Sequence, residues 1–396
     1  MQNKKKLKVS ILISDLSVTG EGRWGGGGVR SFLLAQALQK LECQVEILGF
    51  VFDNQPAVNP ESEIKVFSFN RYNYPRFISS ASQLLKKIDG DIVYAMKPKA
   101  TTFGLSLLKR LKTRKPVILD IDDWELNWVG GEEWRYRPSL KQFARDILKS
   151  EGALRHPDHP LYIQWMQNIA RKADVITIHT QFLQKRFGGV FVANGKDTSL
   201  FNPELYNSGE SKKRYGLSEH KILMFPGAPR PFKGLEDVLM ALDKLNDSTF
   251  KLVIVGGSPY DDYDVQLKEK WGRWIIQLPQ HPFDKMPDIV AAADVIVVPQ
   301  RNTPAALAQF PMKLTDGMSM AKPILATKIG DIPDILDDTG YMVDPSSPEQ
   351  IADKIEYIFQ NLESAMEKGK RARERCMKYY SIDAMASDLS QVISSL

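Results

Sequence analysis

The chain has 396 residues, of which 43% are hydrophobic and 26% charged, a composition that excludes a disordered or fibrous protein. Its two cysteines, Cys43 and Cys376, exclude a disulfide framework and a cysteine zinc cluster. The net charge is +5, and residues 1–200 carry 30 Lys and Arg against 20 Asp and Glu. This basic first half favours an anionic partner or surface, and the alternative is a solvated charged face.

The N-terminus resembles a signal peptide over only a few residues. Lys4 to Lys6 precede an apolar run from Val9 to Ile13, and Asp15 ends that run too early for export. No apolar run approaches the roughly 20 residues that a membrane span needs. We therefore expect a cytoplasmic protein, whose contact with the inner face of the membrane is at most peripheral.

The first half alternates short β-branched runs with amphipathic helical stretches. It opens as a βαβ unit with a strand at 8–13, a helix at 29–41 and a strand at 45–51. Further strands are expected at 92–95, 117–119 and 175–178, with a helix at 103–111. Such alternation is typical of a parallel, doubly wound sheet.

A segment from 124 to about 170 interrupts this rhythm. It has few strand signals and many large aromatic residues: Trp124, Trp128, Trp134, Tyr136, Tyr162 and Trp165. We expect a helical insertion on the first domain.

The pattern restarts in the second half. Strands are expected at 222–225, 252–255, 295–298 and 323–326, with a helix at 235–245. The polar stretch 194–218 has the composition of a linker. We therefore predict an α/β protein of two Rossmann-like doubly wound domains, 1–197 and 198–379, with a helix at 380–396 packing back on the first.

Two glycine-rich loops have the properties of anion-binding sites. Gly27 and Gly28 precede the first helix, whose N-terminus contributes about half a positive charge. The loop 227–234 lies between a strand and a helix and contains Arg230 and Lys233. Both cations can neutralise phosphate oxygens, so the two loops together favour diphosphate binding over two solvated turns.

A third segment, 310–318, precedes the strand at 323–326. If a helix begins near Pro311, a favourable first-turn residue, its N–H groups and Asp316 face the ligand. Asp316 would then accept hydrogen bonds from ribose hydroxyls. The alternative is an exposed helical carboxylate.

The stretch from Asn194 to Pro203 reads Asn-Gly-Lys-Asp-Thr-Ser-Leu-Phe-Asn-Pro. It resembles the Asn-Gly-x-Asp-Thr-x-x-Phe-x-Pro hinge signature of glycosyltransferase family 4. The glycines before the first helix, the 227–234 loop, Gly256-Gly257 and the segment 313–323 follow in that family's order. The resemblance covers most of the chain and is weakest over 50–170.

The resemblance implies a B-type glycosyltransferase fold, in which two Rossmann-like domains face a cleft. The first domain would bind the acceptor and the second the nucleotide sugar. It implies metal-independent transfer of a hexosyl or related sugar to a hydroxyl acceptor, with retention of anomeric configuration and without a cofactor. The acceptor would be a glycan, a lipid-linked molecule or a small molecule, as in polysaccharide biosynthesis, and no nucleic acid is expected as a partner.

The resemblance also assigns residues. Lys233 and Arg230 would hold the diphosphate, and Asp122 stands where the family has a histidine that contacts the donor sugar; these three are the expected catalytic residues. The base is expected near 277–280. The expected donor-binding residues are Gly27, Gly28, Gly227, Lys233, Gly256, Leu278, Phe310, Met312, Lys313, Leu314 and Asp316.

Two departures keep other functions open. The family's paired glutamates have seven residues between them, and the same spacing counted back from Asp316 gives Ala308. This favours, as an alternative, a sugar-nucleotide-binding partner subunit with impaired catalysis; a nucleotide-sugar epimerase would instead need a carboxylate pair around the sugar. Asp120 and Asp122 leave a metal-dependent A-type glycosyltransferase as a further alternative, since carboxylates can hold magnesium or manganese beside a diphosphate. The two separate α/β patterns and the cations of the 227–234 loop are evidence against it.

The acceptor surface is expected on the first domain. A basic amphipathic helix there can lie on an anionic bilayer. It combines apolar Phe103, Leu107, Leu108 and Leu111 with Lys109, Arg110, Lys112, Arg114 and Lys115. The tryptophans of 124–134 would add anchoring or stack on a sugar. We predict peripheral membrane contact and a lipid-linked or otherwise anionic acceptor, against the alternative of a soluble basic face.

Overall fold

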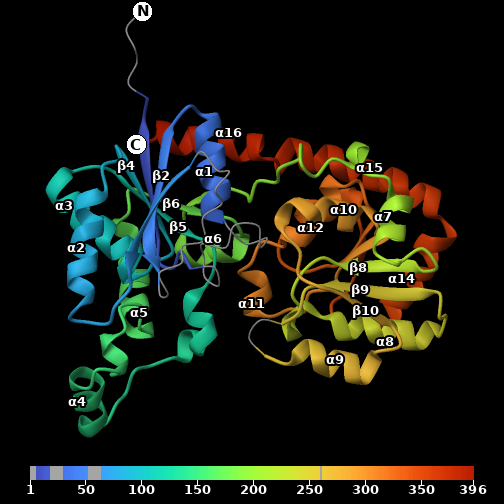
Figure 1. The fold of residues 1–396 in the computed structure, drawn as a ribbon, viewed down its shortest axis with the longest axis horizontal. Coiled ribbons are helices and arrows are strands. Elements are labelled where there is room, and N and C mark those ends of the chain that lie inside the picture. Colours follow the sequence, from blue (N-terminus) through green and yellow to red (C-terminus); the bar gives the residue numbers. More distant parts are fainter. Residues whose placement is uncertain (1–5, 18–29, 52–63, 259–260) are drawn as a thin grey trace, which may run out of the picture. The chain divides into compact units, whose positions relative to one another are not determined.

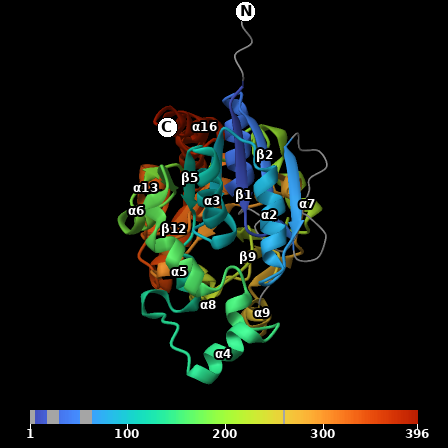
Figure 2. The same cartoon turned by 90° about the vertical axis from the view of Figure 1, so that its left-hand side faces the viewer.

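The computed structural model describes residues 6–17, 30–51, 64–258 and 261–396. These residues form two compact α/β units, drawn in Figures 1 and 2. Among them, unit 1 comprises 6–17, 30–51, 64–193 and 385–396, and unit 2 comprises 194–258 and 261–384. Each unit has its own parallel sheet, which confirms the expected fold class of two Rossmann-like doubly wound domains.

The sheet of unit 1 has seven parallel strands in the order β3-β2-β1-β4-β5-β6-β7. They are β1 (Lys8–Ile13), β2 (Gln44–Val51), β3 (Lys65–Asn70), β4 (Ile92–Met96), β5 (Val117–Ile121), β6 (Val175–Ile178) and β7 (Val190–Phe191). Every residue of β4 and β5 is buried. This is the burial expected for central parallel strands, because helices cover both faces of such a sheet.

The helices of unit 1 outside residues 124–170 follow these strands in the chain. They are α1 (Arg30–Lys40), α2 (Phe77–Lys87), α3 (Leu105–Thr113), which follows a π-helical turn at Ala100–Gly104, α6 (Gln181–Phe187) and, at the C-terminus, α16 (Ile382–Ser394). From Met385 onward α16 belongs to unit 1, and it buries Met385, Leu389 and Val392. These apolar residues recur at helical spacing, so one face of the helix is buried.

Residues 124–170 contain helices and no strand, as expected of a helical insertion. The helices are α4 (Leu140–Leu148) and α5 (Pro160–Asn168), with the 3-10 turns Glu125–Val129, Gly131–Glu133 and Ala153–Arg155. Nη2 of Arg71 lies 3.0 Å from Oδ2 of Asp158, and Thr101 donates a 2.8 Å hydrogen bond to the same carboxylate. This buried contact joins the insertion to the rest of unit 1. Helix α4 lies well apart from the sheet of that unit (Figures 1 and 2).

The sheet of unit 2 has six parallel strands in the order β10-β9-β8-β11-β12-β13. They are β8 (Lys221–Phe225), β9 (Phe250–Val255), β10 (Ile275–Leu278), β11 (Val295–Val298), β12 (Ile324–Thr327) and β13 (Tyr341–Val343). Alternate residues enter different apolar clusters: Met224 lies in one and Leu223 in the other. Side chains alternate along a strand, so the sheet has a core on each face.

The helices of unit 2 cover these two cores. They are α7 (Ser208–Arg214), α8 (Leu235–Leu245), α9 (Tyr263–Trp271), α10 (Met286–Ala291), α11 (Pro304–Leu307), α12 (Met312–Ser319), α13 (Ile332–Leu336), α14 (Pro348–Gln360) and α15 (Leu362–Tyr379). Helix α14 packs on α8, and α15 packs on α12.

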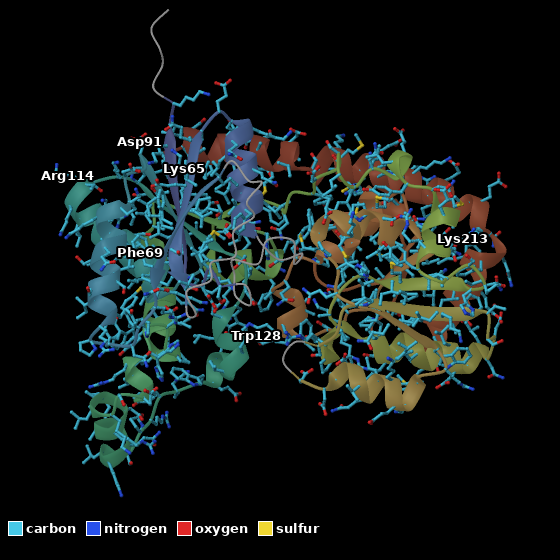
Figure 3. The ribbon with its side chains drawn as sticks, in the orientation of Figure 1. Lys65, Phe69, Asp91, Arg114, Trp128 and Lys213 are labelled. Atoms are coloured by element: carbon cyan, nitrogen blue, oxygen red, sulfur yellow. The ribbon has the colours of Figure 1, made fainter. Side chains whose placement is uncertain are left out.

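The polar stretch 194–218, expected as a linker, is built into unit 2 instead. It contains α7 and buries Phe201 and Leu217 in the core. The stretch has the composition of a linker because most of its residues are polar. Most residues of the short helix α7 are exposed, including Lys213, which Figure 3 labels.

Candidate active site

The carboxyl edge of the unit 2 sheet has a topological switch point. Strand β8 pairs with β9 on one side and β11 on the other, with Leu223 opposite Leu252 and Val295. The connections that leave β8 and β11 therefore separate, and open α/β sheets bind ligands between such connections. The β8 connection contains the predicted residues Gly227, Arg230 and Lys233.

Two glycines shape the loop after β8. Gly227 has a φ of 153° and Gly234 a φ of 72°. A Cβ at Gly234 would lie 1.9 Å from the carbonyl oxygen of Pro299, and a Cβ at Gly227 would lie 2.7 Å from Cε of Lys313. Glycine therefore lets this loop approach the segment after β11 closely. The 3-10 turn Pro231–Lys233 lies between the two glycines and follows the half-buried Arg230.

This approach brings two lysines to the switch point. Lys233 is 9% exposed, and its Nζ donates a 3.2 Å hydrogen bond to Oε1 of Gln309. Nζ of Lys313 lies 4.9 Å from the ring centre of Phe225, the last residue of β8. Burial lowers the pKa of Lys313, and the nearby Asp316 acts in the opposite direction. An anion bound here would favour the charged form of Lys313.

The ends of β9 and β10 form the next part of this edge. Gly256 has a φ of 90°, and its N–H donates a 2.9 Å hydrogen bond to the carbonyl oxygen of Leu278. Nε2 of Gln277 donates to the carbonyl oxygen of Gly256 at 3.1 Å and to Asp264 at 2.9 Å. These bonds hold together the backbone of the region expected to receive a nucleotide base.

Helix α12 begins at Met312, directly after Pro311, close to its expected start. Leu314 is fully buried, and the ring of Phe310 packs 5.9 Å from that of Tyr380. Met312 is half-buried. These apolar contacts position the helix that carries Lys313 and Asp316.

Asp316 is 9% exposed and forms an ion pair with Lys196. Lys196 is 2% exposed, and its Nζ lies 3.2 Å from the ring centre of Phe201. The alternative of an exposed helical carboxylate is therefore wrong, because Asp316 is buried and neutralises a buried cation. Its role at the ribose stays a prediction. Sequence reasoning missed Lys196, although it occupies the variable position of the Asn-Gly-x-Asp-Thr stretch.

Gln309 was also missed. Ala308, which stands where the family has its first motif carboxylate, is fully buried. The next side chain, Gln309, supplies the amide oxygen that binds Lys233. The only sequence signal was its place beside the missing carboxylate.

In unit 1, Asp120 at the end of β5 is fully buried. Nε of Arg30 lies 2.7 Å from Oδ2 of Asp120, and Nη2 donates a 3.0 Å hydrogen bond to Oδ1. Thr177 donates to Oδ1 at 2.6 Å and lies 2.8 Å from the hydroxyl of Tyr94. Burial and the charge of Asp120 raise the pKa of Tyr94.

These bonds make Asp120 a structural residue, so its expected role as a metal ligand in an A-type enzyme is not supported. Within the described ranges, no three His, Cys, Asp or Glu side chains gather in an arrangement that could hold a metal ion. The two-domain fold also differs from the one that the A-type alternative implies.

Asp122 lies just beyond β5, in a network of charges. Nζ of Lys97 is 3.9 Å from Oδ1 of Asp122 and 2.8 Å from Oε1 of Glu125. Lys99 lies 3.1 Å from Oε2 of Glu125. The carboxyl edge of the unit 1 sheet thus pairs its cations with carboxylates. The predicted Gly27 and Gly28 lie outside the described residues.

The basic helix expected to contact a membrane corresponds to α3, and much of its charge serves unit 1 itself. Lys109 donates to the carbonyl oxygen of Leu85 at 2.9 Å, and Arg110 donates to that of Lys172 at 2.7 Å. Phe103 is fully buried, whereas Leu108 and Leu111 are exposed. Arg114, labelled in Figure 3, is exposed at the end of α3.

The tryptophans of 124–134, expected to add anchoring at a membrane or to stack on a sugar, have different environments. Trp124 is buried, with the guanidinium of Arg186 3.9 Å from its ring centre. Trp128, labelled in Figure 3, is exposed and donates a 3.0 Å hydrogen bond to Asp123. In the described part of the chain, no helix has both the length and the apolar character required to cross a bilayer.

Two doubly wound units define the class as a B-type glycosyltransferase fold. A crystal structure of HepE from Anabaena in complex with UDP and glucose is 16% identical, covers 98% of this chain and 100% of its own, and has a TM-score of 0.73. WaaG, a glycosyltransferase involved in lipopolysaccharide biosynthesis, is 15% identical with a TM-score of 0.66, and the match covers 98% of this chain and 99% of its own. These likenesses show the fold.

The family follows from the sequence comparisons. The model of "Glycosyltransferase Family 4" matches residues 24–196, and that of "Glycosyl transferases group 1" matches residues 220–361. The chain belongs to this family of group 1 glycosyltransferases.

Curated relatives are similar at low identity. A D-inositol 3-phosphate glycosyltransferase of Corynebacterium glutamicum is 25% identical over 57% of this chain, which spans 58% of that relative's length. An uncharacterised glycosyltransferase of Methanocaldococcus jannaschii is 23% identical over 75% of this chain and 94% of its own length. A sulfoquinovosyl transferase of Arabidopsis thaliana is 27% identical over 77% of this chain and 56% of its own length.

Proposed function

We propose that this glycosyltransferase moves a hexosyl or related sugar from a nucleotide diphosphate sugar to a hydroxyl acceptor, with retention of anomeric configuration and without a metal ion. The observation that carries the proposal is the presence of two lysines at the switch point of unit 2. Lys233 lies in the β8 loop and bonds to Gln309, and Lys313 lies against Gly227 of the same loop. Two ammonium groups there match the charge of a diphosphate. The UDP complex of HepE and the names of the sugar-transferring relatives support a nucleotide-sugar donor.

The two lysines act on the leaving group. When the bond from the anomeric carbon to the diphosphate oxygen breaks, negative charge develops on that oxygen. Lys233 and Lys313 stabilise this charge in a partly buried site, with Arg230 as a further cation from the same loop. The acceptor oxygen forms the new bond on the same face of the sugar, and its proton passes to the departing diphosphate.

The other predicted residues place the nucleoside and the sugar. Asp316 accepts hydrogen bonds from ribose hydroxyls with the oxygen lone pairs that Lys196 does not use. The backbone around Gly256 and Leu278 receives the base. We further propose that Asp122 acts toward the sugar, that the backbone of Gly27 and Gly28 acts toward the phosphates, and that unit 1 carries the acceptor surface.

The test is release of free nucleotide diphosphate from a panel of UDP-, GDP- and ADP-sugars, with and without excess EDTA. Activity should persist in EDTA, because lysines replace a metal at the diphosphate. Loss in EDTA with rescue by manganese would contradict the metal-free proposal. Donor binding without any release would favour a sugar-nucleotide-binding subunit, and an inverted product seen by proton NMR would contradict retention.

A further inference from the structure

Helix α4 in the insertion of unit 1 has its apolar side chains exposed to solvent. Leu140 is 91% exposed and Leu148 is 73% exposed, and Phe143 and Ile147 are exposed as well. Their spacing places them on one face of the helix. The one buried side chain of α4 is Asp146, which accepts a 2.8 Å hydrogen bond from Tyr136. In a helix that packs on a core the apolar side chains are buried and the charged ones exposed, whereas α4 shows the opposite arrangement.

An apolar cavity of about 630 Å³ lies beside this helix. Its lining includes Tyr74, Ala100, Ile147, Leu154, Tyr162 and Trp165, which come from the insertion and from the ends of neighbouring segments of unit 1. The volume lies within the range of small-molecule sites. Ile147 belongs both to the exposed face of α4 and to the cavity, so the two apolar surfaces are continuous.

Cations surround these apolar surfaces. Residues 135–155 contain six Lys or Arg against two Asp or Glu, and one of those two carboxylates is the buried Asp146. Lys141, Arg145 and Lys149 are exposed on α4 or at its end. Arg155 lines the cavity and donates a 2.7 Å hydrogen bond to the carbonyl oxygen of Ile147. An apolar face flanked by cations complements an anionic bilayer, where acyl chains lie beneath negative headgroups.

Trp165 adds a third observation. This residue is 53% exposed and lines the cavity. Tryptophan is enriched at membrane interfaces because its ring is apolar and its N–H group is polar. A soluble protein partner would cover the face of α4, but it would not account for a chain-sized apolar cavity continuous with that face.

We propose that α4 and this cavity form a lipid-binding site. The exposed face of α4 lies in the headgroup region of an anionic bilayer, and the cavity takes the acyl or polyprenyl chain of a lipid. The inference rests on the proposed function in one respect, namely that the bound lipid carries the acceptor hydroxyl.

Vesicle flotation tests the contribution of the helix. The wild-type protein should float with phosphatidylglycerol-containing vesicles at low salt and be released at high salt, and it should not float with pure phosphatidylcholine. The variant Leu140→Asp/Phe143→Asp should bind at least 10-fold more weakly with an unchanged melting temperature, because both side chains are already exposed. The matched control is Leu108→Asp/Leu111→Asp on α3, which should bind as the wild type does.

Fluorescence quenching tests the cavity. Phosphatidylglycerol with brominated acyl chains should quench the tryptophan emission of the bound protein. Most of that quenching should disappear in Trp165→Phe, while flotation of this variant persists. Equal quenching in the two proteins would show that the chain does not enter the cavity.

Three outcomes would overturn the proposal: wild-type binding by the α4 variant, loss of binding in the α3 control instead, or a dimer that Leu140→Asp/Phe143→Asp dissociates. The last would identify a second copy of the chain as the occupant. Donor turnover with a soluble acceptor should be the same in the α4 variant and the wild type. If neither the wild type nor the α4 variant processed any donor while lipid binding behaved as expected, the proposed function would be wrong and the lipid-binding site would still be supported.

Discussion

The two units share one architecture but differ in the partners of the lysines at the switch point of the sheet. In both, a parallel sheet reverses its strand order, between β1 and β4 in unit 1 and between β8 and β11 in unit 2. At the edge of unit 1, Lys97 and Lys99 pair with Glu125. In unit 2, Lys233 donates to the neutral amide of Gln309, and Lys313 lies against the ring of Phe225.

This difference shows that one fold can carry different charge arrangements at the same edge of its sheet. Burial lowers the pKa of Lys313, so a bound anion would stabilise its charged form. Under the proposed function, that anion is the diphosphate of the donor. Four variants test this contrast.

The largest effect is expected in the core of unit 1. Asp120→Ala leaves Arg30 buried without its carboxylate, which should cost about 3–5 kcal/mol of unfolding free energy. Hydrogen exchange of the β1 and β5 amides in urea would measure the loss within unit 1. Asp89→Ala, which removes an exposed partner of Lys8, should cost less than about 1 kcal/mol. Similar losses in the two variants would remove the structural role of Asp120.

Lys233→Ala should lower turnover of a confirmed donor about 100-fold, equivalent to about 2.7 kcal/mol of transition-state stabilisation. Initial rates at saturating donor would measure it. Lys213→Ala, on the exposed surface of α7, removes an equal charge and should change the rate less than about twofold. A normal rate for Lys233→Ala would mean that the phosphate lies elsewhere.

Asp316→Asn should weaken binding of the nucleoside diphosphate of a confirmed donor about 10-fold, since an amide is a poorer acceptor for ribose hydroxyls than a carboxylate. It should also lower stability, by about 1.5–3 kcal/mol, because Lys196 loses its counter-charge. Calorimetry and thermal unfolding would separate the two effects. In Lys196→Met/Asp316→Asn stability should recover and affinity should not; recovery of affinity would mean that Asp316 acts only through Lys196.

The smallest effect concerns pH. Burial lowers the pKa of Lys313, and a bound diphosphate should raise it. The charged form binds the anion, so the affinity for the nucleoside diphosphate of a confirmed donor should fall as pH rises through the lowered pKa of the unliganded Lys313. Arginine stays charged as the pH rises, so Lys313→Arg should flatten the profile. Parallel slopes for the two proteins would exclude Lys313 as the titrating group.

Several strands were predictable because each is buried on both faces. Val295–Val298 and Ile222–Phe225 are continuous apolar runs, the pattern that a central parallel strand must have. The edge strand β3 (Lys65–Asn70) was missed, because it is partly exposed and its residues are mixed in character. The stretch 194–218 was misjudged because its few buried side chains, such as Phe201, are outnumbered by polar ones.

The glycine-rich loop after β8 could be located in the sequence for a different reason. A glycine at a left-handed position and a lysine in the same short loop are local features, so Gly227, Gly234 and Lys233 can be recognised in a single stretch of sequence. Family resemblance added the order of the motifs along the chain. The family models then confirmed the glycosyltransferase assignment.

Local patterns thus decided the two α/β domains, the family and the cationic loop, since hydrophobic periodicity and glycine positions depend on residues close in sequence. Tertiary structure alone decided which charges have partners. Lys233 meets Gln309 across 76 residues, Lys196 meets Asp316 across 120, and Arg30 meets Asp120 across 90. Whether a lysine or an aspartate binds a ligand or stabilises the core depends on such long-range neighbours, because burial and the nearest opposite charge set the free energy of each charged group.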